Sequence, residues 1–129
     1  MYKRIFLFVL VLLVSFVLQA QTARKLTVNI TPDGESNVQV FLPQNPNGKT
    51  VVGCPGGGYS HLSMQNEGTD WADFFNSQGI TYCVLKYRMP NGHFETSLSD
   101  VQEAIKIMRQ HTDDWKVNPN KVGVMGCSA

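Results

Sequence analysis

The last nine residues, 121–129, constrain this chain more than any other stretch. They read Lys-Val-Gly-Val-Met-Gly-Cys-Ser-Ala, so a short valine-rich run continues directly into Gly-x-Ser-x. A buried strand that delivers a serine into a tight turn has this pattern, and the flanking residues are small because a side chain two positions from the serine would collide with the turn. Ser128 is therefore the candidate nucleophile.

A second stretch repeats the combination of an apolar run and glycines. Val51 and Val52 lie in a short apolar segment, and residues 55–59 that follow read Pro-Gly-Gly-Gly-Tyr. Three consecutive glycines let main-chain N–H groups point toward one place, because no Cβ stands in the way. The pattern predicts an anion-binding turn after a buried strand.

The rest of the chain supplies the elements between these two stretches. Period-two alternation predicts strands at 24–30 and 38–42, joined by a Thr-Pro-Asp-Gly turn as an antiparallel hairpin. Further strands are predicted at 49–54, 80–87 and 121–125, with helices at 66–78 and 98–111 between them. Strands that alternate with helices predict a single α/β domain, with a largely parallel sheet covered on both faces.

Each predicted helix carries signals for its ends and its buried side. The first has Asn66 as a possible N-cap, acidic residues including Glu67 near its start, and Gly79 as its stop. Its aromatic residues Trp71, Phe74 and Phe75 are expected in the core. In the second helix, a capping box is formed by Ser99 and Gln102, and the apolar stripe contains Val101, Ala104, Ile105 and Met108.

The first twenty residues have the composition of an export signal. A basic start with Lys3 and Arg4 precedes the apolar run 5–18, and a polar sequence follows Ala20. We expect cleavage after Ala20, which leaves residues 21–129 as the domain, a formal charge of −1 and a periplasmic or extracellular location. The alternative is an uncleaved membrane anchor, although the run of 14 residues is shorter than the roughly 20 that span a bilayer.

Charge and cysteine usage exclude several classes of function. A near-neutral balance without a basic run argues against a nucleic-acid partner. Three cysteines are too few and too unevenly spaced for a disulfide scaffold or a zinc site, so Cys54, Cys83 and Cys127 are expected as buried free thiols, with a Cys54–Cys127 bridge as the alternative. No metal or organic cofactor is implied, and nothing in the sequence indicates an oligomeric state.

The serine and the glycines together predict acyl-transfer chemistry. Such a reaction needs a nucleophile, a base, and donors aimed at the oxygen that becomes negative. The loops that follow parallel strands lie at one edge of a sheet. The loop at 56–58, here called the glycine turn, and the tight turn at Ser128, here called the serine corner, should therefore face the same crevice. The N–H of Ala129 and an N–H of Gly57 or Gly58 could then share one oxyanion.

No residue before the serine is a good candidate for the base. His61 is expected in a solvated loop near the crevice, His93 in a glycine-rich loop and His111 at a helix end. Asp100 is expected to serve the helix dipole and packing from the first turn of its helix. Cys127 is rejected as a nucleophile because Met125 occupies the position where its motif would need glycine.

Residues 24–129 resemble the N-terminal half of a secreted α/β-hydrolase, most closely the esterase branch that includes acetyl xylan and feruloyl esterases. The matching segments are 55–59, 85–88, Asp100 with 104–105, and 122–129. The resemblance implies an oxyanion hole from Gly57, Gly58 and Ala129, and an acid and a histidine that follow the serine in chain order. It departs from related lipases at Cys54-Pro55, where they carry histidine before the glycines.

The resemblance implies a serine esterase that removes acetyl or feruloyl groups from plant polysaccharide through an acyl-enzyme on Ser128. Without the acid and the histidine, the 129 residues by themselves are expected to be inactive and, with an unpaired strand at the sheet edge, poorly soluble. Two alternatives remain open. One is a serine exopeptidase on the same fold, and the other is a fragment that binds or has no function.

Overall fold

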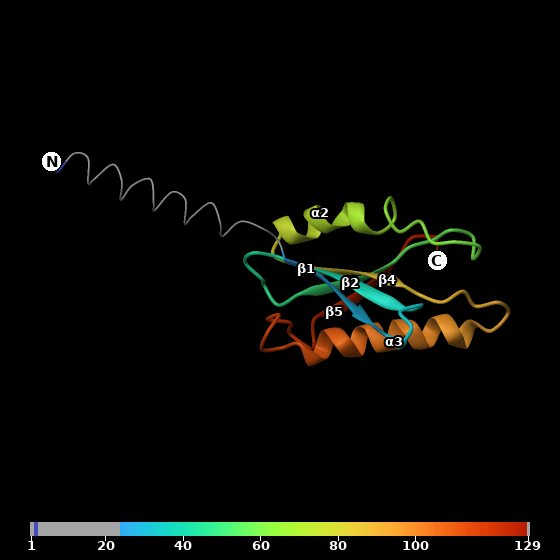
Figure 1. Ribbon diagram of the computed structural model, residues 1–129. Coiled ribbons are helices and arrows are strands. Elements are labelled where there is room, and N and C mark those ends of the chain that lie inside the picture. The colour runs from blue at the N-terminus through green and yellow to red at the C-terminus, as the bar shows by residue number, and fades with distance from the viewer. Residues whose placement is uncertain (1, 3–23, 129) are drawn as a thin grey trace.

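The computed structural model describes residue 2 and residues 24–128. The predicted export signal therefore lies outside the described residues, apart from Tyr2, and so does Ala129. The described chain contains five strands and two α-helices (Figure 1). The strands are β1 (Arg24–Asn29), β2 (Asn37–Leu42), β3 (Thr50–Cys54), β4 (Thr81–Lys86) and β5 (Val122–Gly126); the helices are α2 (Ala72–Ser77) and α3 (Phe94–Gln110), with a 3₁₀ turn η1 (Thr69–Trp71) before α2.

The strands form one mixed sheet in the order β1-β2-β4-β3-β5. The predicted hairpin is confirmed, since β1 pairs antiparallel with β2, and β2 pairs antiparallel with β4. The strands β4, β3 and β5 are parallel, with Val52 opposite both Cys83 and Val124. Because β3 and β5 are parallel neighbours, the segments that follow Cys54 and Gly126 leave the sheet side by side.

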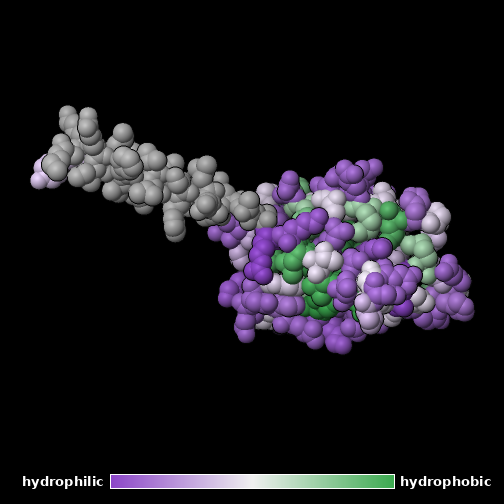
Figure 2. All heavy atoms as spheres, in the orientation of Figure 1, coloured by the Kyte–Doolittle hydropathy of each residue, from purple (hydrophilic) through white to green (hydrophobic). Residues whose placement is uncertain are grey.

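The two α-helices cover opposite faces of the sheet (Figure 1). Alternate residues of β4 point to each face, so Tyr82 and Val84 pack on the α2 side whereas Cys83 and Leu85 pack on the α3 side. All four are fully buried, as expected for a central strand. Hydrophobic side chains are visible between the two helical layers in Figure 2, where most of the surface shown is polar.

The helix predicted at 66–78 begins later than expected, and the prediction of Asn66 as its cap is wrong. Residues 64–68 form turns, and α2 has no side-chain cap. The reason is tertiary: the Gly68 carbonyl accepts a hydrogen bond of 3.0 Å from the buried Tyr82 hydroxyl, and the Gly68 backbone is far from helical with φ −131° and ψ −95°. The predicted stop at Gly79, with φ +76°, is confirmed.

The aromatic residues of this segment are only partly in the core. Phe75 stacks on Tyr82 with the ring centroids 4.7 Å apart. Trp71 and Phe74, however, are 39% and 55% exposed, so their prediction as core residues is wrong. A helix of six residues offers one short side to the sheet, and Trp71 precedes it.

The second helix is longer than predicted, because α3 begins at Phe94. The capping box is wrong, since the Ser99 hydroxyl donates to the Thr96 carbonyl inside the helix at 2.8 Å. The first turn is instead attached to the sheet by Ser97, whose hydroxyl donates to the Arg88 carbonyl at 2.7 Å. The predicted apolar stripe is confirmed: Ala104 and Met108 are fully buried, and Val101 and Ile105 pack against the same cluster.

The three cysteines are free thiols. Cys54 and Cys83 are buried as predicted, whereas Cys127 is only half-buried. Burial raises the pKa of Cys54 to about 11, so this thiol stays protonated at neutral pH. Within residues 24–128, no helix has both the length and the apolar character needed to span a bilayer.

Candidate active site

Ser128 lies immediately after β5, where the chain leaves the sheet. It is exposed, and its backbone has φ +55°, in the left-handed region that residues other than glycine seldom adopt. A left-handed backbone costs a non-glycine residue roughly 1–2 kcal/mol, and such residues cluster at functional sites. The corner is thus tight enough to present the serine side chain at the edge of the sheet.

The glycine turn after β3 is in contact with this corner. A Cβ built on Gly56 would lie 2.8 Å from the Ser128 Cβ and would collide with the Cys127 carbonyl oxygen. Residues more than 70 positions apart are therefore in van der Waals contact only because position 56 has no side chain. The structure brings the two predicted stretches together at one point.

The carbonyl groups of Pro55, Gly56 and Gly57 are all bound by neighbouring donors. The Pro55 carbonyl accepts from the buried Tyr87 hydroxyl at 2.5 Å, and the Gly56 carbonyl accepts from the Ser63 N–H at 2.8 Å. The Gly57 carbonyl accepts from both the N–H and the hydroxyl of Ser60, at 3.2 and 3.0 Å. The peptide planes that carry the N–H groups of Gly56, Gly57 and Gly58 are thereby held in orientation.

The N–H groups of the turn differ from one another. The Gly56 N–H donates to the Glu67 carboxylate at 2.8 Å. The N–H groups of Gly57 and Gly58 have no acceptor among residues 24–128. Both glycines have positive φ, +148° and +64°, which turns successive N–H groups away from the strand direction. Two adjacent donors therefore remain available to an incoming negative oxygen.

Two residues of this site were missed or misassigned by sequence reasoning. Glu67 was predicted as an acidic residue at a helix start, but its carboxylate binds the Gly56 N–H instead. Tyr87 was placed only as part of a strand, yet its hydroxyl holds the Pro55 carbonyl. Neither contact has a local sequence signal, because the partners are 11 and 32 residues apart.

None of the three histidines is hydrogen-bonded to Ser128 in the described part of the chain. His61 is exposed, with its Nδ1 3.1 Å from the Ser60 hydroxyl. His111 stacks on Trp115 with the ring centroids 3.4 Å apart, and its Nδ1 lies 2.8 Å from the Asp114 carboxylate. His93 is exposed just before α3. None of these histidines is therefore placed to act as the general base for Ser128.

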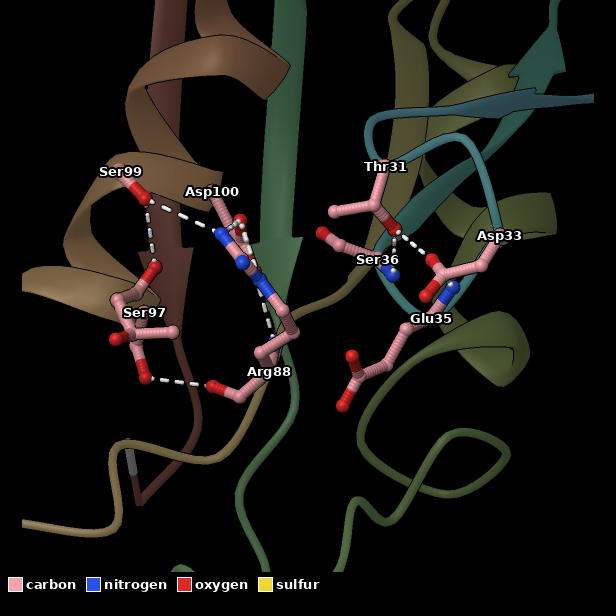
Figure 3. Close-up of polar contacts among 9 residues, drawn as sticks. Thr31, Asp33, Glu35, Ser36, Arg88, Ser97, Ser99 and Asp100 are labelled. Carbon is pink, nitrogen blue, oxygen red and sulfur yellow. Dashed lines mark hydrogen bonds and ion pairs between the residues drawn. The ribbon is translucent and has the colours of Figure 1, made fainter.

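Asp100 forms an ion pair with Arg88 rather than serving the helix dipole (Figure 3). It lies in the second turn of α3, not the first, and its side chain is 1% exposed. It accepts from the Arg88 Nη2 at 2.7 Å and from the Arg88 main-chain N–H at 2.8 Å. Burial alone would raise the pKa of Asp100, but these hydrogen bonds outweigh it and hold the pKa below its usual value. The pair ties the end of β4 to α3.

A groove of about 230 Å³ opens next to the corner, between α3 and β5. Its walls are mainly apolar, with Leu98 and Val101 from α3 and Val124 from β5. Tyr59 and Tyr87 line the side toward the glycine turn. Small-molecule sites combine such apolar walls with a few convergent polar groups. No group of three or more potential metal ligands occurs among the described residues.

The family model for BD-FAE matches residues 38–129, which run from β2 to the serine corner. The chain belongs to the BD-FAE family. This BD-FAE chain is also 46% identical over 118 residues to an acetylxylan esterase from Xylanibacter ruminicola. That match covers 92% of the chain and 25% of the relative, so the chain spans about a quarter of the length of this curated relative.

Solved structures show the same architecture. An acetyl ester-xyloside bifunctional hydrolase from Caldicellulosiruptor lactoaceticus is 29% identical, with a TM-score of 0.61 over 70% of this chain and 34% of that one. A sugar hydrolase from Lactococcus lactis is 28% identical, with a TM-score of 0.65 over 82% and 42% of the two chains. An α/β-hydrolase from a deep-sea metagenome, 20% identical, has a TM-score of 0.68 over 81% and 46%. The predicted α/β-hydrolase fold is therefore confirmed.

Proposed function

We propose that this BD-FAE chain carries the nucleophile and the oxyanion hole of a serine carboxylic-ester hydrolase. Ser128 is the nucleophile, and the N–H groups of Gly57, Gly58 and Ala129 are the oxyanion donors. The observation that carries the proposal is the contact between the glycine turn and the serine corner, with two N–H groups of the turn left without an acceptor among the described residues. An esterase relative and esterase structural neighbours support it.

In this reaction the Ser128 hydroxyl attacks the ester carbonyl and gives its proton to a base. The carbonyl oxygen becomes negative in the tetrahedral intermediate. The N–H groups of Gly57 and Gly58 donate to it without reorganising, because the Gly56 and Gly57 carbonyls, which share their peptide planes, are already bound. Collapse releases the alcohol and leaves an acyl group on Ser128, which water then removes. One donor of this kind is worth about 3 kcal/mol of barrier.

The base and its acidic partner are proposed to lie in sequence that follows Ser128. In the α/β-hydrolase fold the acid and the histidine come after the nucleophile in chain order. Since no described histidine contacts Ser128, residues 1–129 by themselves are expected to give no ester turnover. The complete gene product is the form to test.

The proposed substrate class is an acetyl or feruloyl ester of plant polysaccharide. Two similar proteins support the acetyl ester, the acetylxylan esterase and the acetyl ester-xyloside hydrolase. The apolar groove beside the corner offers space for an acyl group between Val124 and Leu98. Export to the periplasm or the medium, where polysaccharide is met, is proposed from the apolar segment 5–18.

The test uses the complete gene product with p-nitrophenyl acetate, acetylated xylan and a fluorophosphonate probe. We expect probe labelling on Ser128 and acetate release from xylan. Ser128→Ala should lose labelling and reduce kcat by roughly 10⁴-fold or more. Ser77→Ala, which removes an exposed hydroxyl at the end of α2, is the matched control and should leave both unchanged.

Other results would redirect the assignment. Cleavage of alanyl or prolyl p-nitroanilides in place of esters would indicate the exopeptidase alternative. Full ester turnover by Ser128→Ala would refute the nucleophile. A soluble complete protein with no labelling and no turnover would support a non-catalytic role.

A further inference from the structure

The hydrogen-bond ladder between β3 and β5 stops one step earlier than its register predicts. The Thr50 N–H donates to the Lys121 carbonyl at 2.9 Å, and the Cys127 N–H donates to the Cys54 carbonyl at 3.0 Å. In parallel strands the donor groups that face one neighbour recur every second residue. The first donor of this series beyond the end of β3 is the Gly56 N–H, and its partner in the extended register would be the Cys127 carbonyl.

This donor goes to Glu67 instead. The Gly56 N–H lies 2.8 Å from the Glu67 Oε2, although the Cys127 carbonyl oxygen is close enough to collide with a Cβ on Gly56. The Glu67 carboxylate therefore occupies the acceptor position that the register assigns to the Cys127 carbonyl. The serine corner is thereby released from the sheet ladder and can turn into its left-handed conformation at Ser128.

The same carboxylate closes a ring of hydrogen bonds around the turn. The Gly56 carbonyl accepts from the Ser63 N–H at 2.8 Å, and the Ser63 carbonyl accepts from the Glu67 N–H at 3.1 Å. The Glu67 Oε2 then accepts from the Gly56 N–H and completes the ring. Both main-chain groups of Gly56 are therefore fixed by the segment 63–67, which lies outside the sheet.

We propose that Glu67 is a positioning residue for the oxyanion hole. It acts through Gly56. Its carboxylate ends the β3–β5 ladder, and it orients the peptide plane of the Gly56 N–H, which directly precedes the N–H groups of Gly57 and Gly58. Because its carboxylate accepts the hydrogen bond of the Gly56 N–H, the donors left for the oxyanion are the N–H groups of Gly57 and Gly58. The inference rests on the proposed serine-esterase function and adds a residue that does not touch the substrate.

Substitutions at position 67 differ in whether they can still accept the hydrogen bond of the Gly56 N–H. Gln at position 67 keeps an acceptor oxygen at the same reach, whereas Asp keeps the charge but shortens the arm by one methylene. Ala removes the acceptor. If Glu67 acts by positioning, kcat should be highest in the parent, lower in Glu67→Gln, and lowest in Glu67→Asp and Glu67→Ala, which should be alike. If the role needed the negative charge itself, kcat of Glu67→Asp should exceed kcat of Glu67→Gln.

The experiment measures kcat and KM of the complete gene product on p-nitrophenyl acetate, together with the rate of fluorophosphonate labelling. A displacement of about 1 Å at a catalytic group can reduce the rate by about 10²-fold. We expect Glu67→Ala and Glu67→Asp to lower kcat by about that factor with KM within about threefold of the parent, and Glu67→Gln to stay within about tenfold of the parent kcat. Glu103→Ala, on the exposed side of α3, is the control.

Folding of each variant is checked by circular dichroism and thermal melting. Parent-like kcat in folded Glu67→Ala would overturn the proposal, and so would a folded Glu67→Gln that is slower than Glu67→Asp. If Ala and Asp do not fold, a loss of more than about tenfold in folded Glu67→Gln overturns it, and retention supports it. A parent that is never labelled at Ser128 refutes the proposed function instead, which separates the two failures.

Discussion

Replacing Gly56 by alanine tests the contact between the glycine turn and the serine corner. The added methyl would collide with the Cys127 carbonyl oxygen and would lie 2.8 Å from both the Glu67 Oε2 and the Ser128 Cβ. Ordinary contacts of a Cβ begin at 3.4 Å, so the methyl is about 0.6 Å too close to each of these two atoms. Two of the obstacles are the main chain of residue 127 and the Cβ of residue 128, which no change of rotamer can move.

If Gly56→Ala folds, the serine corner must therefore move away from the glycine turn. Overpacking of this kind destabilises a protein by about 1–3 kcal/mol. A retreat of more than half an ångström also separates Ser128 from the Gly57 and Gly58 donors, and misplacement on this scale reduces the rate by between about 10-fold and 10²-fold. We expect both losses together in the complete gene product.

The assay combines kcat on p-nitrophenyl acetate with urea unfolding followed by circular dichroism. Gly123→Ala is the matched control: it lies on β5, its added Cβ would approach nothing closer than the Thr50 carbonyl oxygen at 3.9 Å, and its φ is not positive. The control should be neutral, or more stable by up to about 1 kcal/mol. Gly56→Ala with the stability and kcat of Gly123→Ala would refute the reasoning.

The ion pair and the tyrosine beside the turn give two further expectations. Asp100→Ala should destabilise the protein by about 2–3 kcal/mol in urea unfolding, below the 3–5 kcal/mol of a fully buried pair because the Arg88 side chain is 32% exposed. The pKa of Asp100 is lowered from 3.8, so the contribution of the pair is present above that pH and lost as the pH falls through the lowered pKa; parent and variant should converge in acid, and a gap that persists there would contradict the account. Tyr87→Phe leaves the buried Pro55 carbonyl without its donor, which should remove about 1–3 kcal/mol of stability and lower kcat in the same assays; an unchanged kcat would show that this bond does not orient the turn.

Local patterns predicted the parts of the fold that depend on local physics. Period-two alternation located β1 and β2, and apolar runs located β3, β4 and β5 to within a residue or two. The stripe through Ala104 and Met108 identified the buried side of α3 because helical periodicity is a property of the segment itself. Gly79 marked the end of α2 because its left-handed backbone favours glycine.

Predictions that depended on distant partners failed. Asn66 and Glu67 have the residue types of a helix start, but the Gly68 carbonyl is held by Tyr82 and the Glu67 carboxylate by the Gly56 N–H. Ser99 fits a capping box, but α3 begins earlier, where Ser97 binds the Arg88 carbonyl. In each case a hydrogen bond across the fold outweighed the local preference.

The sequence by itself determined the order of strands and helices, the glycines of the turn and the serine at the end of β5, because all of these follow from backbone freedom and hydrophobic periodicity. Only the tertiary structure decided which N–H groups of the turn remain available, since that depends on Tyr87, Ser63, Ser60 and Glu67 arriving from other segments. A hydrogen bond needs its two atoms within about 3 Å. Residues far apart in the chain meet that condition only after the sheet has brought β3 and β5 together.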